Sequence, residues 1–426
     1  MSQVMIMCPT RRDHRELKLL RGFEELNFLS HDYATVALEE LSANEPPADV
    51  SIDDPEAEIQ RVLERCVREN VEAVASSDDY PGATLASIAA KELHLPGVLP
   101  ATNLLCQHKY FSRQFQQAAA PEAVPRFHLL DVRPEAGLPQ GLEFPLFVKP
   151  VKSFFSVGAQ RIDSAAELPP IQQRWLRAAS FFRPFDILLQ RYTGRAMKTQ
   201  FLLAEGLLTG VQTTLDGYVY QGEVYLMGVV DSIMFPGTIA FQRFDYPSQL
   251  PETIQSRMFD VAGRVMRQLE FDNGQFNIEF MYDPGTDAVD IIEINPRMSS
   301  QFGDLYEKVD GTNSYSVMLD LALGRRPQVK KGKGRHAMAS SCVLRTFQNQ
   351  KVLKLPSQGE IEKLLGQYPD MRIEILATEG LKLSQQMQDS VSYRYGLINI
   401  GGRDRQDILD IFDHGAKALS FVFEPA

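Results

Sequence analysis

The sequence of 426 residues lacks several features that would identify a class of protein at once. Its four cysteines have no paired spacing, which excludes a Cys-rich zinc module or a disulfide scaffold and points to the reducing cytoplasm: Cys8, Cys66, Cys106 and Cys342. No apolar run approaches the roughly 18 residues that span a bilayer. The opening, MSQVMIMCPTRRDHRE, has an apolar stretch too short for a signal peptide. We therefore expect no membrane partner.

Positively charged residues are also fewer than negatively charged ones. The chain has 44 Lys and Arg against 55 Asp and Glu, a net charge of −11 with neutral His. Because a nucleic-acid binder needs a basic stripe to neutralise phosphates, this balance excludes one, although it allows a local basic pocket for a small anion. No G-x-G-x-x-G follows the first predicted strand, so a nicotinamide cofactor is not expected there. What is left is an acidic enzyme of roughly two to four domains.

The first hundred residues alternate between strand and helix patterns. QVMIMC and VEAVAS read as short buried strands, and the segment between them places apolar residues at helical spacing: Ile59, Val62, Leu63, Cys66 and Val67. An Ala-rich helix, ATLASIAAKELHL, follows the second strand. This alternation predicts a small parallel α/β unit over residues 1–104.

The rest of the chain reads as further α/β or α+β units. We predict one long helix carrying Leu104, Leu105, His108, Phe111 and Phe115 on one face, and another that begins at Pro251. Strands are predicted for EFPLFVKPV, DILLQRY, TQFLLAEGLLTGVQTT and EVYLMGVVD, and beyond the linker KKGKGRH for CVLRTF, RIEILA and GLINI. The aromatic stretch 231–251 is either a lid over a substrate or a loop packed on the core.

The most informative stretch is QFNIEFMYDPGTDAVDIIEINPRMSSQ, in which two β-rich runs flank the turn DPGTDA. A hairpin symmetric about Thr286 places Glu279 opposite Glu293, and Asn277 opposite Asn295. Opposed carboxylates among apolar neighbours repel unless a cation lies between them. Two carboxylates and an amide oxygen suit Mg²⁺ shared with a substrate phosphate. The alternative is an exposed hairpin face with solvated glutamates.

Three basic residues are candidates for binding an anion. Lys149 follows FPLFV inside an apolar strand, where a lysine needs a partner. Arg297 could clamp a carboxylate or phosphate in a bidentate manner, or form a surface ion pair. Lys109, on an amphipathic helix, could equally be a solvated lysine.

Several of these segments together resemble the ATP-grasp ligases over about residues 95–325. The run from Glu293 to Arg297 resembles the metal-binding E-x-N-x-R segment of that family, with Glu279 matching the acidic residue on the preceding strand. PGVLPATNLLCQHKYFSRQF resembles the segment before the nucleotide fold, where Lys109 matches the first nucleotide-binding lysine. FPLFVKPVKSFFSVGA resembles the lysine strand and phosphate loop, with Lys149 as the second lysine.

The phosphate loop of this resemblance holds Ser156, Val157 and Gly158. DILLQRYTG resembles the strand leading into the adenine-contacting linker, here Gln190, Arg191 and Tyr192. The chain also departs from the family pattern. Bulky residues stand in the phosphate loop, Gln190 replaces the usual Glu, and no carboxylate follows where the ribose is usually held: Ser153, Phe154, Phe155, Ala196, Met197 and Lys198.

The resemblance implies an α/β fold with α+β grasp lobes: an N-terminal domain (1–104), a small lobe (105–190), a large lobe with the metal site (191–330) and a C-terminal α+β domain (331–426). It also implies ATP and Mg²⁺, with Mn²⁺ as an alternative ion. The implied nucleotide contacts are Lys109, Lys149, Ser156, Gly158, Gln190, Arg191 and Tyr192. The implied metal ligands are Glu279, Glu293 and Asn295, and the implied catalytic residues are Arg297 and Lys149.

The activity implied by the resemblance is ATP-dependent formation of a carbon–nitrogen bond. A carboxylate is activated as an acyl phosphate and coupled to an amine, an amino acid or a related small molecule, with release of ADP and phosphate. The alternatives are a carboxylate–thiol ligase or carboxylating enzyme of the same fold, and a non-catalytic nucleotide-binding scaffold. Because ligases of this kind are often dimers, a homodimer is a further expectation.

Overall fold

The computed structural model describes residues 2–32, 54–133, 138–153, 158–178, 183–196, 200–385 and 392–426. At the N-terminus, three parallel strands in the order β2-β1-β3 form a small sheet; the sequence predicts the parallel arrangement and the strands β1 and β3, but not β2. Thr10 caps α1 in a capping box with Asp13, and Asp54 and Pro55 begin α2. The elements of this N-terminal unit are β1 (Ser2–Met7), α1 (Arg11–Leu19), β2 (Leu26–His31), α2 (Pro55–Arg68), β3 (Val71–Ala75) and α3 (Thr84–Glu92).

A four-stranded sheet in the order β4-β7-β5-β6 follows, and we call it and its helices the small lobe. Strand β7 is antiparallel to both β4 and β5, with Lys149 opposite Leu203. The elements are α4 (Pro100–Gln107), α5 (Lys109–Ala119), β4 (Phe127–Asp131), β5 (Leu146–Pro150), β6 (Gln160–Ile162), α6 (Leu168–Ala178), α7 (Arg183–Thr193) and β7 (Phe201–Gly206).

An eight-stranded sheet, which we call the long sheet, has the order β12-β11-β8-β9-β10-β13-β16-β15. Helix α8 packs its apolar face on β8, β11 and β12, and this packing forms a core with Phe276, Ile278 and Ile291 fully buried. The elements of the first part are β8 (Val211–Tyr220), β9 (Glu223–Met234), β10 (Phe241–Tyr246), α8 (Glu252–Gln268), β11 (Gly274–Asp283), β12 (Ala288–Asn295), α9 (Gly303–Asp310) and α10 (Ser314–Ala322).

The C-terminal residues continue the long sheet, because β13 pairs with β10. A separate two-stranded sheet joins β14 to the last strand. The elements are β13 (Met338–Thr346), β14 (Gln350–Lys354), α11 (Gln358–Gln367), β15 (Arg372–Ile375), β16 (Tyr393–Gly402), α12 (Arg405–Ala418) and β17 (Val422–Pro425).

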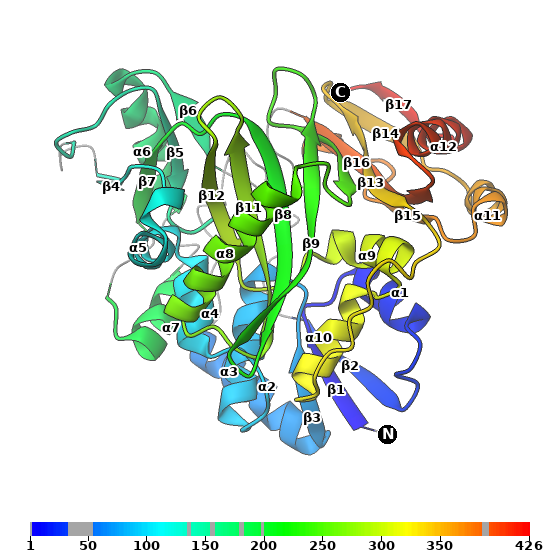
Figure 1. The fold of residues 1–426 in the computed structure, drawn as a ribbon, viewed down its shortest axis with the longest axis horizontal. Helices are drawn as coiled ribbons and strands as arrows, with labels where there is room; N and C mark the ends of the chain where they lie inside the picture. Colours follow the sequence, from blue (N-terminus) through cyan, green and yellow to red (C-terminus); the bar gives the residue numbers. More distant parts are fainter. Residues whose placement is uncertain are drawn as a thin grey trace.

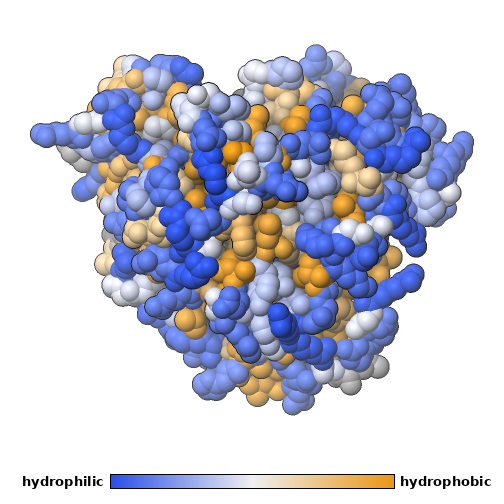
Figure 2. Space-filling view, viewed as in Figure 1, coloured by the Kyte–Doolittle hydropathy of each residue, from blue (hydrophilic) through white to orange (hydrophobic). Residues whose placement is uncertain are grey.

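The parts of the chain surround the middle of the long sheet. The N-terminal unit lies at the bottom of Figure 1, the four-stranded sheet of the small lobe at upper left and the C-terminal strands at upper right, with α8 crossing the face of β8 and β11. Helix α10 joins the N-terminal sheet to the long sheet, because Tyr315 and Leu319 share a core with Val4 and Ile6. Hydrophilic side chains dominate the outer parts of the face shown in Figure 2. Within the described ranges, every helix falls short of the length or apolar character needed to span a bilayer.

Two secondary-structure predictions were wrong. DILLQRY forms helix α7 rather than a strand, because Phe185, Leu188 and Leu189 are buried at helical spacing while Ile187 is exposed. The single helix expected through Leu104 and Phe115 is divided at His108, which has extended backbone and caps α5 through its ring nitrogen.

The stretch 231–251 packs on the core, which is the second of its two predicted alternatives. Strand β10 pairs with β9 and β13 and buries Phe244 and Tyr246. Asp231 accepts hydrogen bonds from the Ser248 hydroxyl at 2.5 Å and from the Gln249 N–H at 2.8 Å. These contacts are structural.

Candidate functional site

The site is built around the hairpin of β11 and β12. Its register places Asn277 opposite Asn295 and Glu279 opposite Glu293, as symmetry about Thr286 predicts. A bulge follows, so that Phe280 pairs with Ile291 and the symmetric register ends beyond the two glutamates. The hairpin therefore presents two opposed carboxylates on one face.

The two carboxylates differ in their surroundings. Burial, and then the charge of Glu293, raise the pKa of Glu279 to about 7. Burial acts in the same direction on Glu293, but Lys109 and Lys149 outweigh it and lower the pKa of Glu293 below its usual value. Gln212 on β8 donates a hydrogen bond to Glu279 at 2.9 Å. The raised pKa of Glu279 therefore comes first from its burial and second from the neighbouring charge of Glu293.

Two predicted lysines reach this face from separate segments. Lys109, at the start of α5, places its Nζ 2.8 Å from Glu293 Oε1 and 3.2 Å from the Ser153 carbonyl. Lys149 on β5 is buried, with its Nζ 2.7 Å from Glu205 Oε2 and 3.3 Å from the Ile292 carbonyl. Both of these lysines and both of the glutamates therefore belong to one cluster.

Glu205 is a member of this cluster that the sequence analysis missed. It lies on β7, fully enclosed between Lys149 and Arg113, whose Nε is 2.5 Å from Glu205 Oε1. Burial alone would raise the pKa of Glu205, but Arg113 and Lys149 lower it to about 2. Glu205 lies inside the apolar strand FLLAEG, where a charged group needs a partner for the same reason as Lys149. The sequence therefore carried a signal that identifies Glu205.

Lys152 and Asp79 link the small lobe to the N-terminal unit and were also missed. The Lys152 side chain is buried, with its Nζ 3.2 Å from Asp79 Oδ2 and about 5 Å above the rings of Tyr80 and Phe185. Burial acts to raise the pKa of Asp79, but the charges of Lys152 and Arg297 lower it. A third lysine thus stands next to the cluster.

Arg297 lies past the end of β12, where it donates to the Met298 carbonyl at 3.3 Å. Its charge acts on Glu279, on the half-buried Asp78 and Asp79, and on the buried Asp216. Arg297 is therefore a positive centre between the hairpin of β11 and β12 and the N-terminal unit.

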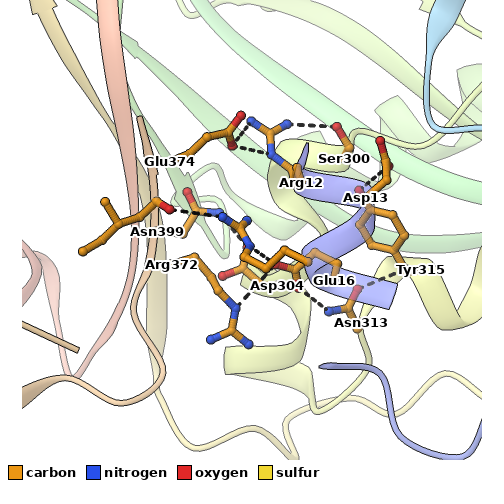
Figure 3. Close-up of polar contacts among 12 residues, drawn as sticks. Arg12, Asp13, Glu16, Ser300, Asp304, Asn313, Tyr315, Arg372, Glu374 and Asn399 are labelled. Carbon is orange, nitrogen blue, oxygen red and sulfur yellow. Dashed lines mark hydrogen bonds and ion pairs between the residues drawn. The ribbon is translucent and has the colours of Figure 1, made fainter. Parts of the chain in front are cut away.

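The loop after Arg297 is held by a polar cluster that joins three parts of the chain (Figure 3). Arg12 on α1 donates to the Ser300 hydroxyl at 2.9 Å and pairs with Glu374 on β15 at 2.6 Å. Asn399 on β16 donates to Asp304 at 2.6 Å. Since these groups are paired, the cluster fixes how the N-terminal unit and the C-terminal strands meet beside the site.

A chain of hydrogen bonds orients Asn295. Its amide nitrogen donates to Asn277 at 3.1 Å, and the Asn277 amide donates to Asp216 at 2.5 Å, which also accepts from the Tyr306 hydroxyl at 2.7 Å. Because Asn295 donates into this chain, its carbonyl oxygen is available as a ligand.

The donor set of the hairpin fits a hard divalent cation. Glu279 and Glu293 supply carboxylate oxygens and Asn295 an amide oxygen, the ligands that Mg²⁺ takes. Among the described residues, no group of three or more His, Cys, Asp or Glu side chains is arranged to hold a metal. The amide oxygen of Asn295 and oxygen atoms of a bound substrate would therefore have to complete the coordination of a metal ion.

The remaining predicted nucleotide contacts lie elsewhere or are not described. Gly158 has φ +76°, and a Cβ there would lie 3.0 Å from Pro150, so the backbone requires glycine. Ser156 and Val157 lie outside the described residues, as do Phe154 and Phe155. The predicted linker residues Gln190, Arg191 and Tyr192 lie on α7. Arg191 and Tyr192 face the N-terminal unit, where Arg191 pairs with Glu56 and Lys91 lies over the Tyr192 ring, and Gln190 is exposed. Their contact with a nucleotide stays a prediction.

Comparison with known proteins agrees with the geometry. Residues 142–304 match the sequence model of the ATP-grasp domain. A search of curated proteins gave no match. The chain is similar in structure to an L-amino acid ligase from Bacillus licheniformis, with 17% identity and a TM-score of 0.73 over 100% of this chain and 99% of that one.

Two further solved structures are similar over their whole length. A phosphoribosylglycinamide synthetase from Anaerococcus prevotii has 14% identity and a TM-score of 0.65, covering 99% of this chain and 100% of that one. An N5-carboxyaminoimidazole ribonucleotide synthetase from Thermotoga maritima has 14% identity and a TM-score of 0.63, covering 100% of both chains. At these identities the likeness shows the fold, and it confirms the predicted α/β architecture.

Proposed function

We propose that this chain, whose residues 142–304 match the ATP-grasp domain and whose fold is similar to that of an L-amino acid ligase, is a carboxylate–amine ligase. It would activate a carboxylate as an acyl phosphate with ATP and couple it to an amine, an amino acid or a related small molecule. One observation carries the proposal: Glu279 and Glu293 oppose each other beside the cations of Lys109, Lys149 and Arg297.

The roles of these residues follow from charge. Transfer of a phosphoryl group depends mostly on positioning and on neutralising charge. Lys109 and Lys149 would offset the charge of the phosphates, and Lys109 would exchange its present partner Glu293 for them. Arg297 would orient the substrate carboxylate through two parallel hydrogen bonds. A divalent cation held by Glu279, Glu293 and Asn295 would neutralise phosphate charge when bound.

The end of β7 is a better candidate than α7 for contact with the nucleotide. Strand β7 is the neighbour of β5, and the short connection 207–210 joins the small lobe to the long sheet. Glu205 on this strand is held by Arg113 and Lys149, and the connection begins directly after Gly206. Gly210 has φ +118°, and a Cβ there would lie 2.1 Å from the Tyr282 carbonyl, so this connection requires glycine. We propose that this connection, rather than residues 190–192, contacts the base.

Release of ADP and phosphate tests the proposed activity. Purified protein with ATP and Mg²⁺ is expected to release both when given the correct pair from a panel of amino acids, small carboxylic acids, amines, thiols and bicarbonate. Mass spectrometry of the product then distinguishes an amide from a thioester or a carboxylated product. Absence of nucleotide binding and of ADP release across the whole panel would contradict the proposal, and release only with bicarbonate or a thiol would favour the alternatives.

A further inference from the structure

Asp216 is a buried carboxylate beside the candidate site. Asp216, Asn277 and Asn295 lie side by side across the neighbouring strands β8, β11 and β12. Each oxygen of Asp216 receives one donor: Asn277 Nδ2 is 2.5 Å from Oδ1, and the Tyr306 hydroxyl is 2.7 Å from Oδ2. Neither of these donors is charged. A buried carboxylate held in this way costs free energy, which points to a role other than stability.

Asp216 acts as an acceptor only. Burial raises its pKa to about 6, and the hydrogen bonds from Asn277 and Tyr306 act in the opposite direction, so the group is ionised at about pH 8. A carboxylate has no proton to donate, whereas an amide carries both a donor and an acceptor. Asn277 must therefore turn its NH₂ group to Asp216 and its carbonyl oxygen to Asn295.

The direction of the Asn277 amide decides the direction of the Asn295 amide. The Asn277 oxygen accepts from Asn295 Nδ2 at 3.1 Å, so the carbonyl oxygen of Asn295 stays available for a cation. Without Asp216 the two amides can exchange roles, because each can donate or accept. In the exchanged arrangement the NH₂ group of Asn295 takes the place of its oxygen, and Mg²⁺ takes oxygen ligands.

Helix α9 holds the carboxylate of Asp216 in place. Tyr306 is buried on this helix, and its ring packs edge-on against that of Tyr246, with the ring centres 4.7 Å apart. The Tyr246 hydroxyl in turn donates to Asp310 on the same helix. Turning the carboxylate of Asp216 away from Asn277 would also break its hydrogen bond with Tyr306, so the acceptor is fixed from two sides.

We propose that Asp216 is a positioning residue for the divalent cation: through Asn277 it turns the carbonyl oxygen of Asn295 toward the ion. Asp216 itself touches neither the ion nor the substrate. The inference rests on the proposed function for the presence of a cation at Glu279 and Glu293, and it is independent of which acid and amine are joined. Loss of an outer-shell hydrogen bond of this kind weakens metal binding by about 10- to 100-fold.

Asp216→Asn tests the inference, because it replaces one acceptor by a donor and leaves the chain of amides without a fixed direction. The measurement is binding of Mn²⁺, a spectroscopic probe for Mg²⁺, to the protein in excess over a non-hydrolysable ATP analogue at about pH 8, followed by electron paramagnetic resonance. The Kd for Mn²⁺ is expected to rise about tenfold or more.

Asp231→Asn is the matched control. Asp231 is also a buried carboxylate of the long sheet, and it also accepts from uncharged donors, the Ser248 hydroxyl and the Gln249 N–H. Because these donors are not part of the chain that ends at Asn295, the control is expected to leave the Kd for Mn²⁺ unchanged.

Asn277→Ala separates positioning through Asn277 from a general loss of structure. It removes the middle link of the chain and is expected to raise the Kd for Mn²⁺ as much as Asp216→Asn does. Adding Asp216→Asn to Asn277→Ala is expected to change the Kd little further, because residues that act through one chain are not additive.

An unchanged Kd in Asp216→Asn, an equal rise in Asp231→Asn, rises that add in the double variant, or no Mn²⁺ binding by the wild type would overturn the inference. If circular dichroism shows that Asp216→Asn does not fold, Asn277→Ala decides, and an unchanged Kd there overturns it. Mn²⁺ binding without ADP release on the substrate panel contradicts the proposed function alone. ADP release with an unchanged Kd in Asp216→Asn contradicts the inference alone.

Discussion

Glu293→Gln is expected to lower turnover at saturating ATP and Mg²⁺ by about 100- to 1,000-fold. The variant removes one of the two opposed carboxylates and leaves Lys109 without its partner at 2.8 Å. Loss of one preorganised electrostatic contact to a transferred group costs a factor of this order. The measurement is the rate of ADP release with the best acid and amine from the substrate panel, together with the dependence of that rate on Mg²⁺ concentration.

Asp290→Asn is the matched control for Glu293→Gln. Asp290 lies on the same strand but outside the cluster, opposite Met281. The rate of ADP release by Asp290→Asn is therefore expected to stay within about threefold of the wild-type rate. Circular dichroism and thermal unfolding of both variants verify that the fold is kept. Full turnover by Glu293→Gln would show that the metal assignment is wrong even if the protein is an active ligase.

Glu205→Ala is expected to lower the free energy of unfolding by about 3–5 kcal/mol. The side chain is enclosed between Arg113 and Lys149, so its removal leaves two buried cations without their carboxylate. Breaking a buried pair by removing one partner costs this much because the uncompensated charges stay buried. Urea unfolding monitored by circular dichroism measures the change, provided that the transition is cooperative.

The control for Glu205→Ala is Glu143→Ala. Glu143 pairs with Arg126 on the surface, where the side chains are 68% and 80% exposed, so we expect a change of under about 1 kcal/mol.

The pKa of Glu205, about 2 in the folded protein, lies below the pKa of the same glutamate in the unfolded chain. Its stabilisation is therefore present above pH of about 4.5 and is lost as the pH falls toward 2. An equal loss of stability in Glu205→Ala and Glu143→Ala would contradict the conclusion that Glu205 forms a stabilising buried triad with Arg113 and Lys149.

How far the sequence predicts the site depends on the distance between its parts along the chain. Asn277, Glu279, Glu293 and Asn295 lie on one hairpin, and the period of two with a short turn sets their register locally. Helix α7 shows the opposite case. DILLQRY carries strand and helix patterns at once, and burial of Phe185, Leu188 and Leu189 against the N-terminal unit and the small lobe favours the helix.

The sequence by itself determined that two carboxylates oppose each other, that Lys149 needs a partner inside an apolar strand, and that the segments around them have the order of an ATP-grasp ligase. Only the tertiary structure decided which groups complete the site. Glu205, Lys152 and Asp79 come from separate strands and loops, and Asp216 reaches the hairpin from β8. The reason is physical: a buried charge requires an opposite charge near it in space, and the chain can supply that partner from any distance along the sequence.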